Sequence, residues 1–208
     1  MVDVVVAVMV HDLTQACPDS DERAPAPVLE DGSCPAGALG QDGGVAKKQA
    51  GGTPATEALV KAGVAHTLHP YEHHDGERHF GDEATAALGL DPARVFKTLV
   101  ADVGDGRSRL VVAVVPVARQ LDLKALAAAV GAKKAAMADP AAAQRSSGYV
   151  LGGISPLGQR TPLPTVVDAS AQDFETIHVS GGRRGLQVEL APADLVAVTQ
   201  ATLAEVSR

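Results

Sequence analysis

The sequence Gly-Tyr-Val-Leu-Gly-Gly-Ile-Ser-Pro-Leu-Gly, residues 148–158, is the stretch from which we interpret the rest of the chain. Four glycines and a proline in eleven residues exclude a helix interior, whereas Tyr149 and Ile154 are too apolar for a flexible linker. The stretch therefore predicts a buried, stiff loop. Because Gly152 and Gly153 lack Cβ atoms, a ligand can contact main-chain N–H groups there. A tight turn between core strands is an equally weighted alternative.

The length and composition of the chain favour one aliphatic domain with an appendage. The 208 residues are 46% hydrophobic but only 2% aromatic, so many small contacts must specify the core. No apolar run approaches the roughly 18 residues of a membrane span. Residues 1–10 are apolar but lack a basic start, which argues against a secretory signal. We expect a cytoplasmic protein without a membrane partner.

Residue 52 marks the expected domain boundary. Residues 1–52 are rich in Pro, Gly and Asp without helical or strand periodicity, which predicts a disordered extension. A start codon assigned too far upstream is a second hypothesis for this segment. Both cysteines, Cys17 and Cys34, lie in it, so residues 53–208 offer no disulfide, thiolate metal site or cysteine nucleophile. These residues carry a net charge near −2, which does not indicate binding to DNA or any other nucleic acid, and any such contact needs a local basic patch.

The pattern over residues 53–208 predicts one α/β (α+β) domain. Thr53-Pro54 and Asp139-Pro140 are expected helix starts, because a capping side chain precedes a proline at the first helical position. Adjacent strands are expected to pair antiparallel in a sheet that curls. The expected helices cover residues 55–62, 82–88, 121–130, 139–148 and 192–206, and the expected strands cover residues 64–71, 95–103, 110–117, 163–167, 177–179 and 186–190.

Lys97 is the most informative single residue of the expected strands. Alternation along residues 95–103 places it on one face with Val95, Leu99 and Ala101. A lysine among aliphatic neighbours either extends its ammonium to the rim or projects into a polar cavity. We favour the cavity, because Thr98 and the glycine loop supply polar neighbours.

Five histidines, His66, His69, His73, His74 and His79, cluster in a short segment. His69 and His73 have the i, i+4 spacing of a helical metal pair, but Pro70 lies between them and argues against that helix. We expect solvated or hydrogen-bonded histidines and no metal site.

Six segments stand out in order along the chain, namely Tyr71-Glu72-His73, Phe80-Gly81-Asp82-Glu83, Phe96-Lys97-Thr98-Leu99, Ala138-Asp139-Pro140, Gly148–Gly158 and Val179-Ser180-Gly181-Gly182-Arg183-Arg184-Gly185-Leu186. In order and spacing they resemble the YbaK group of bacterial aminoacyl-tRNA deacylases, and the resemblance spans residues 53–208. The most similar members remove cysteine mischarged onto proline tRNA, and the wider family includes the editing domain of bacterial prolyl-tRNA synthetases.

The resemblance implies a mixed, barrel-like sheet ringed by helices, with one pocket and no cofactor. It implies that the thiol of the attached cysteine attacks its own carbonyl, which suits a domain without a cysteine of its own. Lys97, Gly152 and Gly153 are the implied catalytic residues, with the glycine N–H groups holding the carbonyl oxygen. The implied substrate-binding residues are Tyr71, Phe80, Thr98, Ile154, Ser155, Pro156, Gly158, Ser180, Gly182 and Gln187. The candidate tRNA-contacting residues are Lys133, Lys134, Arg160, Arg183 and Arg184.

Position 187 departs from the family pattern, because the family sometimes has a carboxylate where this chain has Gln187. Glutamine can neither take a proton nor pair with an ammonium as aspartate can.

The expected function is therefore deacylation of Cys-tRNA(Pro) in trans, with aminoacyl-tRNA as partner and prolyl-tRNA synthetase as a candidate partner. Deacylation of Ala-tRNA(Pro) and non-catalytic binding of tRNA ends are the alternatives. A serine hydrolase built on Ser180 and His178 is a weaker one, because the sequence lacks a Gly-x-Ser-x-Gly elbow there.

Overall fold

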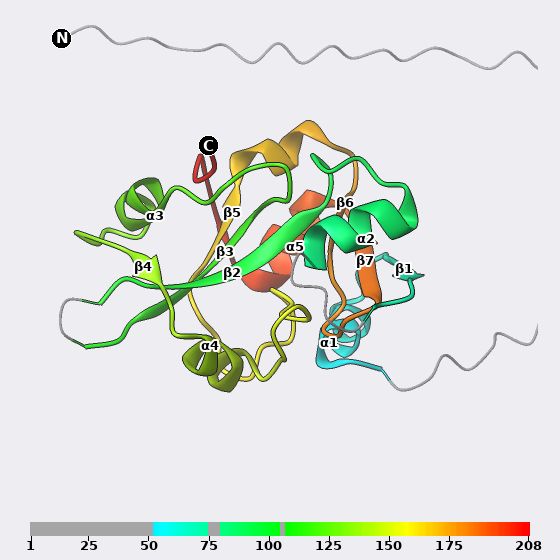
Figure 1. Ribbon diagram of the computed structural model, residues 1–208, viewed down its shortest axis with the longest axis horizontal. Helices are drawn as coiled ribbons and strands as arrows, with labels where there is room; N and C mark the ends of the chain where they lie inside the picture. The colour runs from blue at the N-terminus through cyan, green and yellow to red at the C-terminus, as the bar shows by residue number, and fades with distance from the viewer. Residues whose placement is uncertain (1–51, 75–79, 105–106) are drawn as a thin grey trace, which may run out of the picture. The chain divides into compact units, whose positions relative to one another are not determined.

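The computed structural model describes residues 52–74, 80–104 and 107–208 (Figure 1). Residues 1–51 of the expected extension, His79, and the expected turn residues Asp105 and Gly106 lie outside the described residues, so the domain division stays a prediction. Within the described part, no helix is long and apolar enough to span a membrane.

The described residues form a mixed α/β fold, as expected. Its elements are α1 (Pro54–Ala62), β1 (Thr67–Pro70), α2 (Phe80–Leu88), β2 (Phe96–Asp102), β3 (Leu110–Pro116), α3 (Leu123–Ala129), β4 (Ala136–Met137), α4 (Pro140–Ser147), β5 (Thr165–Asp168), the 3₁₀ helix η1 (Ala169–Asp173), β6 (Ile177–Ser180), β7 (Leu186–Leu190), α5 (Pro192–Thr199) and β8 (Thr202–Ala204).

Local sequence sets the ends of α1 and α4. The Thr53 hydroxyl accepts a hydrogen bond from the Thr56 N–H at 3.2 Å, and the Asp139 carboxylate accepts one from the Ala142 N–H at 3.0 Å. Both helices end at a glycine with left-handed backbone, Gly63 with φ of 67° and Gly148 with φ of 80°. The predicted starts and ends of both helices are confirmed.

The strands form two hydrogen-bonded sheets, in the orders β1-β7-β6 and β4-β2-β3-β5-β8. The β2–β3 and β6–β7 pairs are antiparallel as predicted, but β5 pairs parallel with both β3 and β8. The antiparallel prediction is wrong for β5 because the long connection from β3, which contains α3, β4, α4 and the glycine loop, returns the chain beside β3 in the same direction. In the described part of the chain, a bridge between Val95 and His178 joins the sheets. No closed barrel is found among the described strands, and the barrel-like curl is not confirmed.

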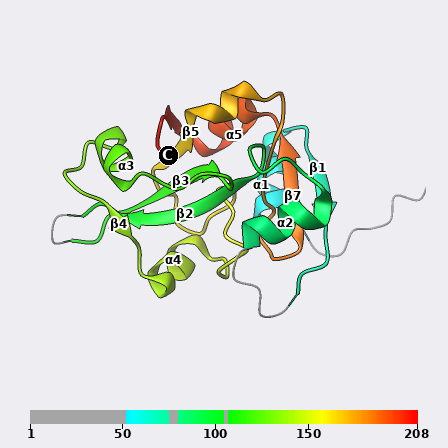
Figure 2. The ribbon, with the colours of Figure 1, turned by 45° about the horizontal axis from the view of Figure 1, so that its top comes forward.

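β3 is buried on both faces and lies at the centre of the core. Val112 and Val114 belong to a cluster that includes residues of α1, α4, α5 and the sheet β1-β7-β6. Val111 and Val115 belong to a second cluster with Leu126 of α3. In both views β4 and α3 lie near one end of the β2–β3 ribbon, and α1, α2, β1 and β7 gather near the other (Figures 1 and 2). β2 therefore runs between the two parts of the described domain.

The predicted C-terminal helix over residues 192–206 is too long. It ends at Thr199, because Gln200 adopts the left-handed region with φ of 51°. Residues 202–204 then pair with β5 as strand β8. Sequence patterning also missed the two-residue strand β4.

We expect Asp168→Asn to lower the free energy of unfolding at pH 7 by about 1.5–3 kcal/mol, the usual cost of a hydrogen bond to a charged group. Asp168 is buried and accepts hydrogen bonds from the Ser170 hydroxyl at 2.5 Å and the Val206 N–H at 3.0 Å. Burial acts to raise the pKa of the Asp168 carboxyl, but these hydrogen bonds outweigh it and lower the pKa overall.

The unfolded Asp168 carboxyl takes up its proton near pH 4, the ordinary value, and the folded one only at a lower pH. The wild type should therefore lose this stabilisation as the pH falls from about 4 through the lowered pKa of the folded state. Urea unfolding at pH 7 and pH 3 should show the difference between variant and wild type shrinking at the lower pH. The exposed Asp173→Asn is the control. A difference that does not change with pH contradicts this account of Asp168.

Candidate functional site

A pocket of about 560 Å³ lies along the edge of β2. β6 joins this edge at Val95, and β4 joins it at Ala101 and Asp102. Between these points no described strand pairs with the edge, so the pocket opens there. Its lining consists of Phe80, Gly81, Asp82, Val95, Phe96, Lys97, Thr98, Leu99, Val100, Val117, Met137, Ala138, Pro140, Ala143, Leu151, Gly152, Ile154, Ser180 and Gln187.

Residues 148–158 form one wall of the pocket and are stiffened by their own hydrogen bonds. The buried Tyr149 hydroxyl donates to the carbonyls of Leu157 at 2.7 Å and Gly158 at 3.2 Å. Burial raises the pKa of Tyr149 to about 12, so its phenol stays protonated at neutral pH. Residues 153–157 are buried. The prediction of a buried loop is confirmed for Tyr149 and residues 153–157, whereas Val150 and Leu151 are exposed.

The paired glycines have different surroundings. Gly152 lines the pocket with φ of +83°, and its N–H has no hydrogen-bond partner among the described residues. The Gly153 N–H donates to the Val150 carbonyl at 3.0 Å, and a Cβ there would lie 2.9 Å from the Arg183 Cα. Gly152 can therefore offer a main-chain donor to a ligand, whereas the Gly153 N–H already has a partner.

We expect Gly152→Ala to destabilise the domain more than Gly63→Ala, by about 1–3 kcal/mol, the usual cost of overpacking. Both residues have positive φ, but a Cβ at Gly152 would lie 2.6 Å from the Phe80 ring, whereas nothing lies within 4 Å of one at Gly63. Both variants place a side chain on a positive-φ backbone, but only Gly152→Ala also brings a Cβ against Phe80. The difference between their free energies of unfolding in urea therefore measures the cost of that collision. Equal losses would show that the Phe80 ring moves away at no cost.

Lys97 lines the pocket, as the cavity interpretation predicts. Its ammonium is partly buried and donates to the Val117 carbonyl at 3.3 Å. Burial lowers the pKa of the Lys97 ammonium, and the negative charge of Asp82, another lining residue, opposes part of this effect. A partly desolvated cation facing a cavity is suited to hold developing negative charge.

Two buried oxygens in lining residues have no hydrogen-bond partner among the described residues, Gln187 Oε1 and Thr98 Oγ1. Gln187 is only 7% exposed. Buried polar atoms are normally paired, so these two acceptors are candidates for contact with a ligand. The Ser180 hydroxyl, also in the lining, accepts a weak hydrogen bond from the Gly182 N–H at 3.4 Å.

The structure places the predicted site residues in two groups. Seven line the pocket, namely Lys97, Gly152, Phe80, Thr98, Ile154, Ser180 and Gln187. Six do not, namely Gly153, Tyr71, Ser155, Pro156, Gly158 and Gly182.

Residues of the second group instead support the wall. Ser155 and Pro156 are buried within the loop. A Cβ on Gly158 would collide with the Pro54 carbonyl, and one on Gly182 with the Tyr149 ring. The Tyr71 N–H donates to the Gly185 carbonyl at 3.0 Å, and burial raises the pKa of the Tyr71 phenol.

The five candidate tRNA-contacting residues are exposed but occupy different segments. The Arg184 guanidinium lies 5.0 Å from the centre of the Phe80 ring, and its Nε donates to the Leu151 carbonyl at 2.9 Å, so it stands at the rim of the pocket. Arg183 packs against Gly153, and Arg160 packs against Gly148. Lys133 and Lys134 lie in the connection between α3 and β4, far along the chain from the arginines.

Sequence reasoning gave no role to several lining residues. Met137 comes from β4, which is too short to show a periodic pattern. Asp82 belongs to one of the family-like segments, and that segment could have marked it as the counter-charge of Lys97.

The expectation of hydrogen-bonded histidines is confirmed for His69 and His73, which contact Glu189 and Glu83 at 2.8 Å. No hydrogen bond between Ser180 and His178 is found in the described part of the chain, so the structure gives the serine hydrolase alternative no support.

The chain that forms this pocket matches a known class of protein. Residues 77–198 match the aminoacyl-tRNA editing domain model, and the chain belongs to this family. It is 40% identical over 142 residues to EbsC of Enterococcus faecalis, which is provisionally named a Cys-tRNA(Pro)/Cys-tRNA(Cys) deacylase. That alignment covers 66% of this chain and 85% of EbsC.

Two further similarities are more distant. The chain is 32% identical over 114 residues to the multifunctional Ser/Thr-tRNA deacylase ProXp-y of Escherichia coli, covering 54% of this chain and 68% of that protein. A solved structure provisionally titled as a trans-editing enzyme for prolyl-tRNA synthetase matches with a TM-score of 0.61 and 25% identity, covering 74% of this chain and 95% of that one.

Proposed function

We propose that the chain is a trans-editing deacylase that removes cysteine from mischarged Cys-tRNA(Pro). The observation that carries the proposal is the pocket that both Lys97 and Gly152 line, in a chain whose residues 53–208 contain no cysteine. The 40% identity to EbsC favours cysteine over the serine and threonine handled by the more distant ProXp-y. A substrate that carries its own thiol needs no protein nucleophile.

In the proposed reaction the substrate thiol attacks the carbonyl carbon of its own ester. The sulfur–carbon bond forms, the bond from that carbon to the terminal ribose oxygen breaks, and the thiol proton ends on the ribose oxygen. Holding the thiol near the carbonyl makes the attack intramolecular, and good orientation can lower such a barrier by about 7–11 kcal/mol.

Protein groups stabilise the charge that develops during this attack. The Gly152 N–H is the proposed donor to the carbonyl oxygen, a contribution of about 3–4 kcal/mol in comparable sites. Lys97 is proposed to stabilise the leaving ribose alkoxide, and its lowered pKa makes it a better proton donor. The proposal gives Gly153, whose N–H is already bonded, a packing role.

The amino acid is proposed to bind against the unpartnered oxygens. Gln187 Oε1 and Thr98 Oγ1 can accept hydrogen bonds from the substrate amino group, while Phe80 and Ile154 enclose the short side chain. Gln187 contributes no charge, so this contact is weaker than the ion pair that a carboxylate there would form.

The proposed tRNA contacts are exposed basic residues. Arg184 at the pocket rim, with Arg183 and Arg160 beside the glycine loop, is proposed to contact phosphates near the tRNA end, and Lys133 and Lys134 are proposed as further phosphate contacts. We place the enzyme in the cytoplasm, acting beside prolyl-tRNA synthetase. Each phosphate contact should steepen the dependence of binding on salt concentration.

Incubation of the full chain with Cys-tRNA(Pro) and, separately, with Ala-tRNA(Pro) tests the substrate assignment. We expect acid-precipitable cysteine label to be lost well above the spontaneous rate, and the alanine label to be lost more slowly. Equal or faster loss of alanine would favour the Ala-tRNA(Pro) alternative. Protection of both esters with no turnover would favour a binding module.

A further inference from the structure

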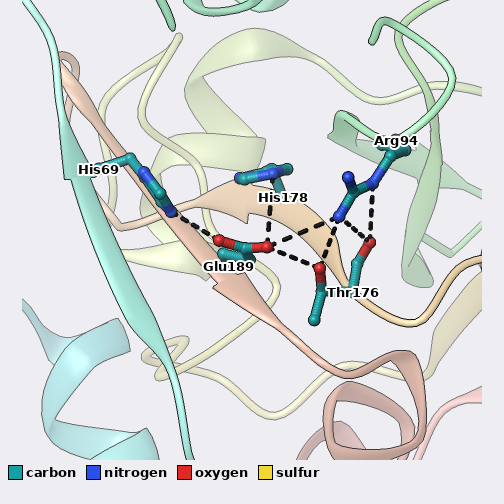
Figure 3. Close-up of polar contacts among 5 residues, drawn as sticks. All are labelled: His69, Arg94, Thr176, His178 and Glu189. Atoms are coloured by element: carbon teal, nitrogen blue, oxygen red, sulfur yellow. Dashed lines mark hydrogen bonds and ion pairs between the residues drawn. The ribbon is translucent and has the colours of Figure 1, made fainter. Parts of the chain in front are cut away.

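Three side chains outside the pocket lining meet on one face of the sheet β1-β7-β6. His69 comes from β1, His178 from β6 and Glu189 from β7, where His178 and Glu189 are directly opposite each other in the strand register. One ligating atom of each lies within 4.8 Å of the other two. Figure 3 shows both imidazoles pointing toward the Glu189 carboxylate.

His178 is a buried imidazole without a hydrogen bond. Its residue is 2% exposed, and its Nδ1 has no partner among the described residues. Its Nε2 faces Glu189 Oε1 across 4.0 Å, which is too long for a hydrogen bond. The unpaired Nδ1 is the other ring nitrogen and does not mark this gap. The 4.0 Å separation between Nε2 and the carboxylate is what leaves room for an ion bound between them.

The Glu189 carboxylate is held from the side opposite His69. The Thr176 hydroxyl donates to Oε1 at 2.6 Å, and Arg94 Nη2 lies 3.6 Å from the same oxygen (Figure 3). Arg94 is itself fixed by hydrogen bonds to the Thr176 carbonyl at 3.0 and 3.2 Å. Oε2 faces His69 Nε2 at 2.8 Å. Groups around a metal ligand commonly orient it in this way.

Two imidazoles and one carboxylate are ligands that favour Zn²⁺ and similar first-row ions over Mg²⁺ or Ca²⁺, which prefer oxygen ligands. A metal–ligand distance of about 2.0 Å in tetrahedral geometry requires ligand atoms about 3.3 Å apart. The distance of 2.8 Å from His69 Nε2 to Glu189 Oε2 would therefore lengthen slightly, and the distance of 4.0 Å from His178 Nε2 to Glu189 Oε1 would shorten. His69 and Glu189 are each about one quarter exposed, which leaves a path for the ion.

We propose that His69, His178 and Glu189 form a three-ligand site for a divalent transition-metal ion of the Zn²⁺ type. The bound ion would join β1, β6 and β7 on the sheet face that also carries Ser180 and Gln187 of the pocket. The positive charge of Arg94 next to the carboxylate opposes a second cation, so the site should bind more weakly than one lacking that arginine. This proposal does not depend on the proposed deacylation.

Titration of the full chain with Co²⁺, followed by competition with Zn²⁺, tests the site. Cys17 and Cys34 lie outside the described residues and are soft ligands, so the titration uses a Cys17→Ser, Cys34→Ser background. We expect one Co²⁺ per chain with the visible bands of a tetrahedral ion, displaced by Zn²⁺. His178→Ala and Glu189→Gln each remove a proposed ligand and should each reduce Co²⁺ affinity more than 100-fold. Thr176→Val removes only a group that orients Glu189, and it should reduce Co²⁺ affinity by roughly 10–100-fold.

His66→Ala is the matched control, because His66 contacts the nearby Val64 carbonyl at 2.8 Å and lies outside the cluster. It should leave Co²⁺ binding unchanged. If His178→Ala fails to fold, Glu189→Gln decides, since it keeps the shape of the side chain. Absence of stoichiometric Co²⁺ binding to the parent chain, or equal losses in His66→Ala and Glu189→Gln, overturns the proposal and leaves a hydrogen-bonded network without metal.

Discussion

Lys97→Met is expected to lower kcat/KM for Cys-tRNA(Pro) by about 10²–10³-fold, the usual effect of removing one group that stabilises charge in a transition state. The ammonium is partly buried in the pocket lining, where water screens it less than at the surface. Methionine keeps the length and apolar stem of the side chain but removes the charge. Single-turnover deacylation measures the loss.

The pH dependence of the same reaction gives an independent readout. Because burial lowers the pKa of Lys97, its ammonium loses the proton at a pH below the ordinary lysine value of about 10.4. The wild-type kcat/KM should therefore fall on an alkaline limb with a midpoint below that value, and Lys97→Met should lack this limb.

Lys124→Met is the control, since Lys124 is exposed on α3. It should retain activity, and urea unfolding should show that the Lys97 variant remains folded. A Lys97→Met protein that deacylates at the wild-type rate would remove Lys97 from the mechanism.

Seryl-tRNA(Pro) is expected to be deacylated at least about 10²-fold more slowly than cysteinyl-tRNA(Pro). A thiol with a pKa near 8.5 is partly ionised at neutral pH, whereas a hydroxyl needs a general base, whose contribution is typically 10²–10⁴-fold. In the described lining, the ionisable side chains are Asp82 and Lys97, and the charge of Asp82 already acts on Lys97. The two esters on the same tRNA, measured side by side, isolate the effect of sulfur.

An S-methylcysteinyl ester provides the matched control, because it keeps the sulfur but blocks the attack. It should resist deacylation while competing for the pocket. If serine leaves as fast as cysteine, the substrate thiol is not the nucleophile, and the activity would then resemble that named for ProXp-y.

Several parts of the fold follow from short-range physics and were predictable. The ends of α1 and α4 depend on Thr53, Asp139, Gly63 and Gly148, all close in sequence to the backbone groups they cap. The end of α5 could not be predicted, because Gln200 is not a residue type that usually ends a helix. There the pairing of residues 202–204 with β5, a contact between distant segments, accompanies the end of the helix.

The candidate site divides in the same way. The resemblance of ordered segments implies Lys97 and Gly152 as site residues without reference to any contact, and both line the pocket. Neither the sequence nor the resemblance separated Gly152 from Gly153, because a single hydrogen bond to Val150 distinguishes their N–H groups. Met137 entered the lining through β4, a strand formed by pairing with β2.

The sequence by itself determined the mixed α/β class, the presence of a glycine loop at residues 148–158 and the family, because capping, alternation and ordered motifs act over neighbouring residues. Only the tertiary structure decided the parallel pairing of β5, the opening of the pocket along β2, and the meeting of His69 with His178 and Glu189. His69 and Glu189 are 120 residues apart. Strand register brings such residues together, and the register cannot be predicted from their spacing along the chain.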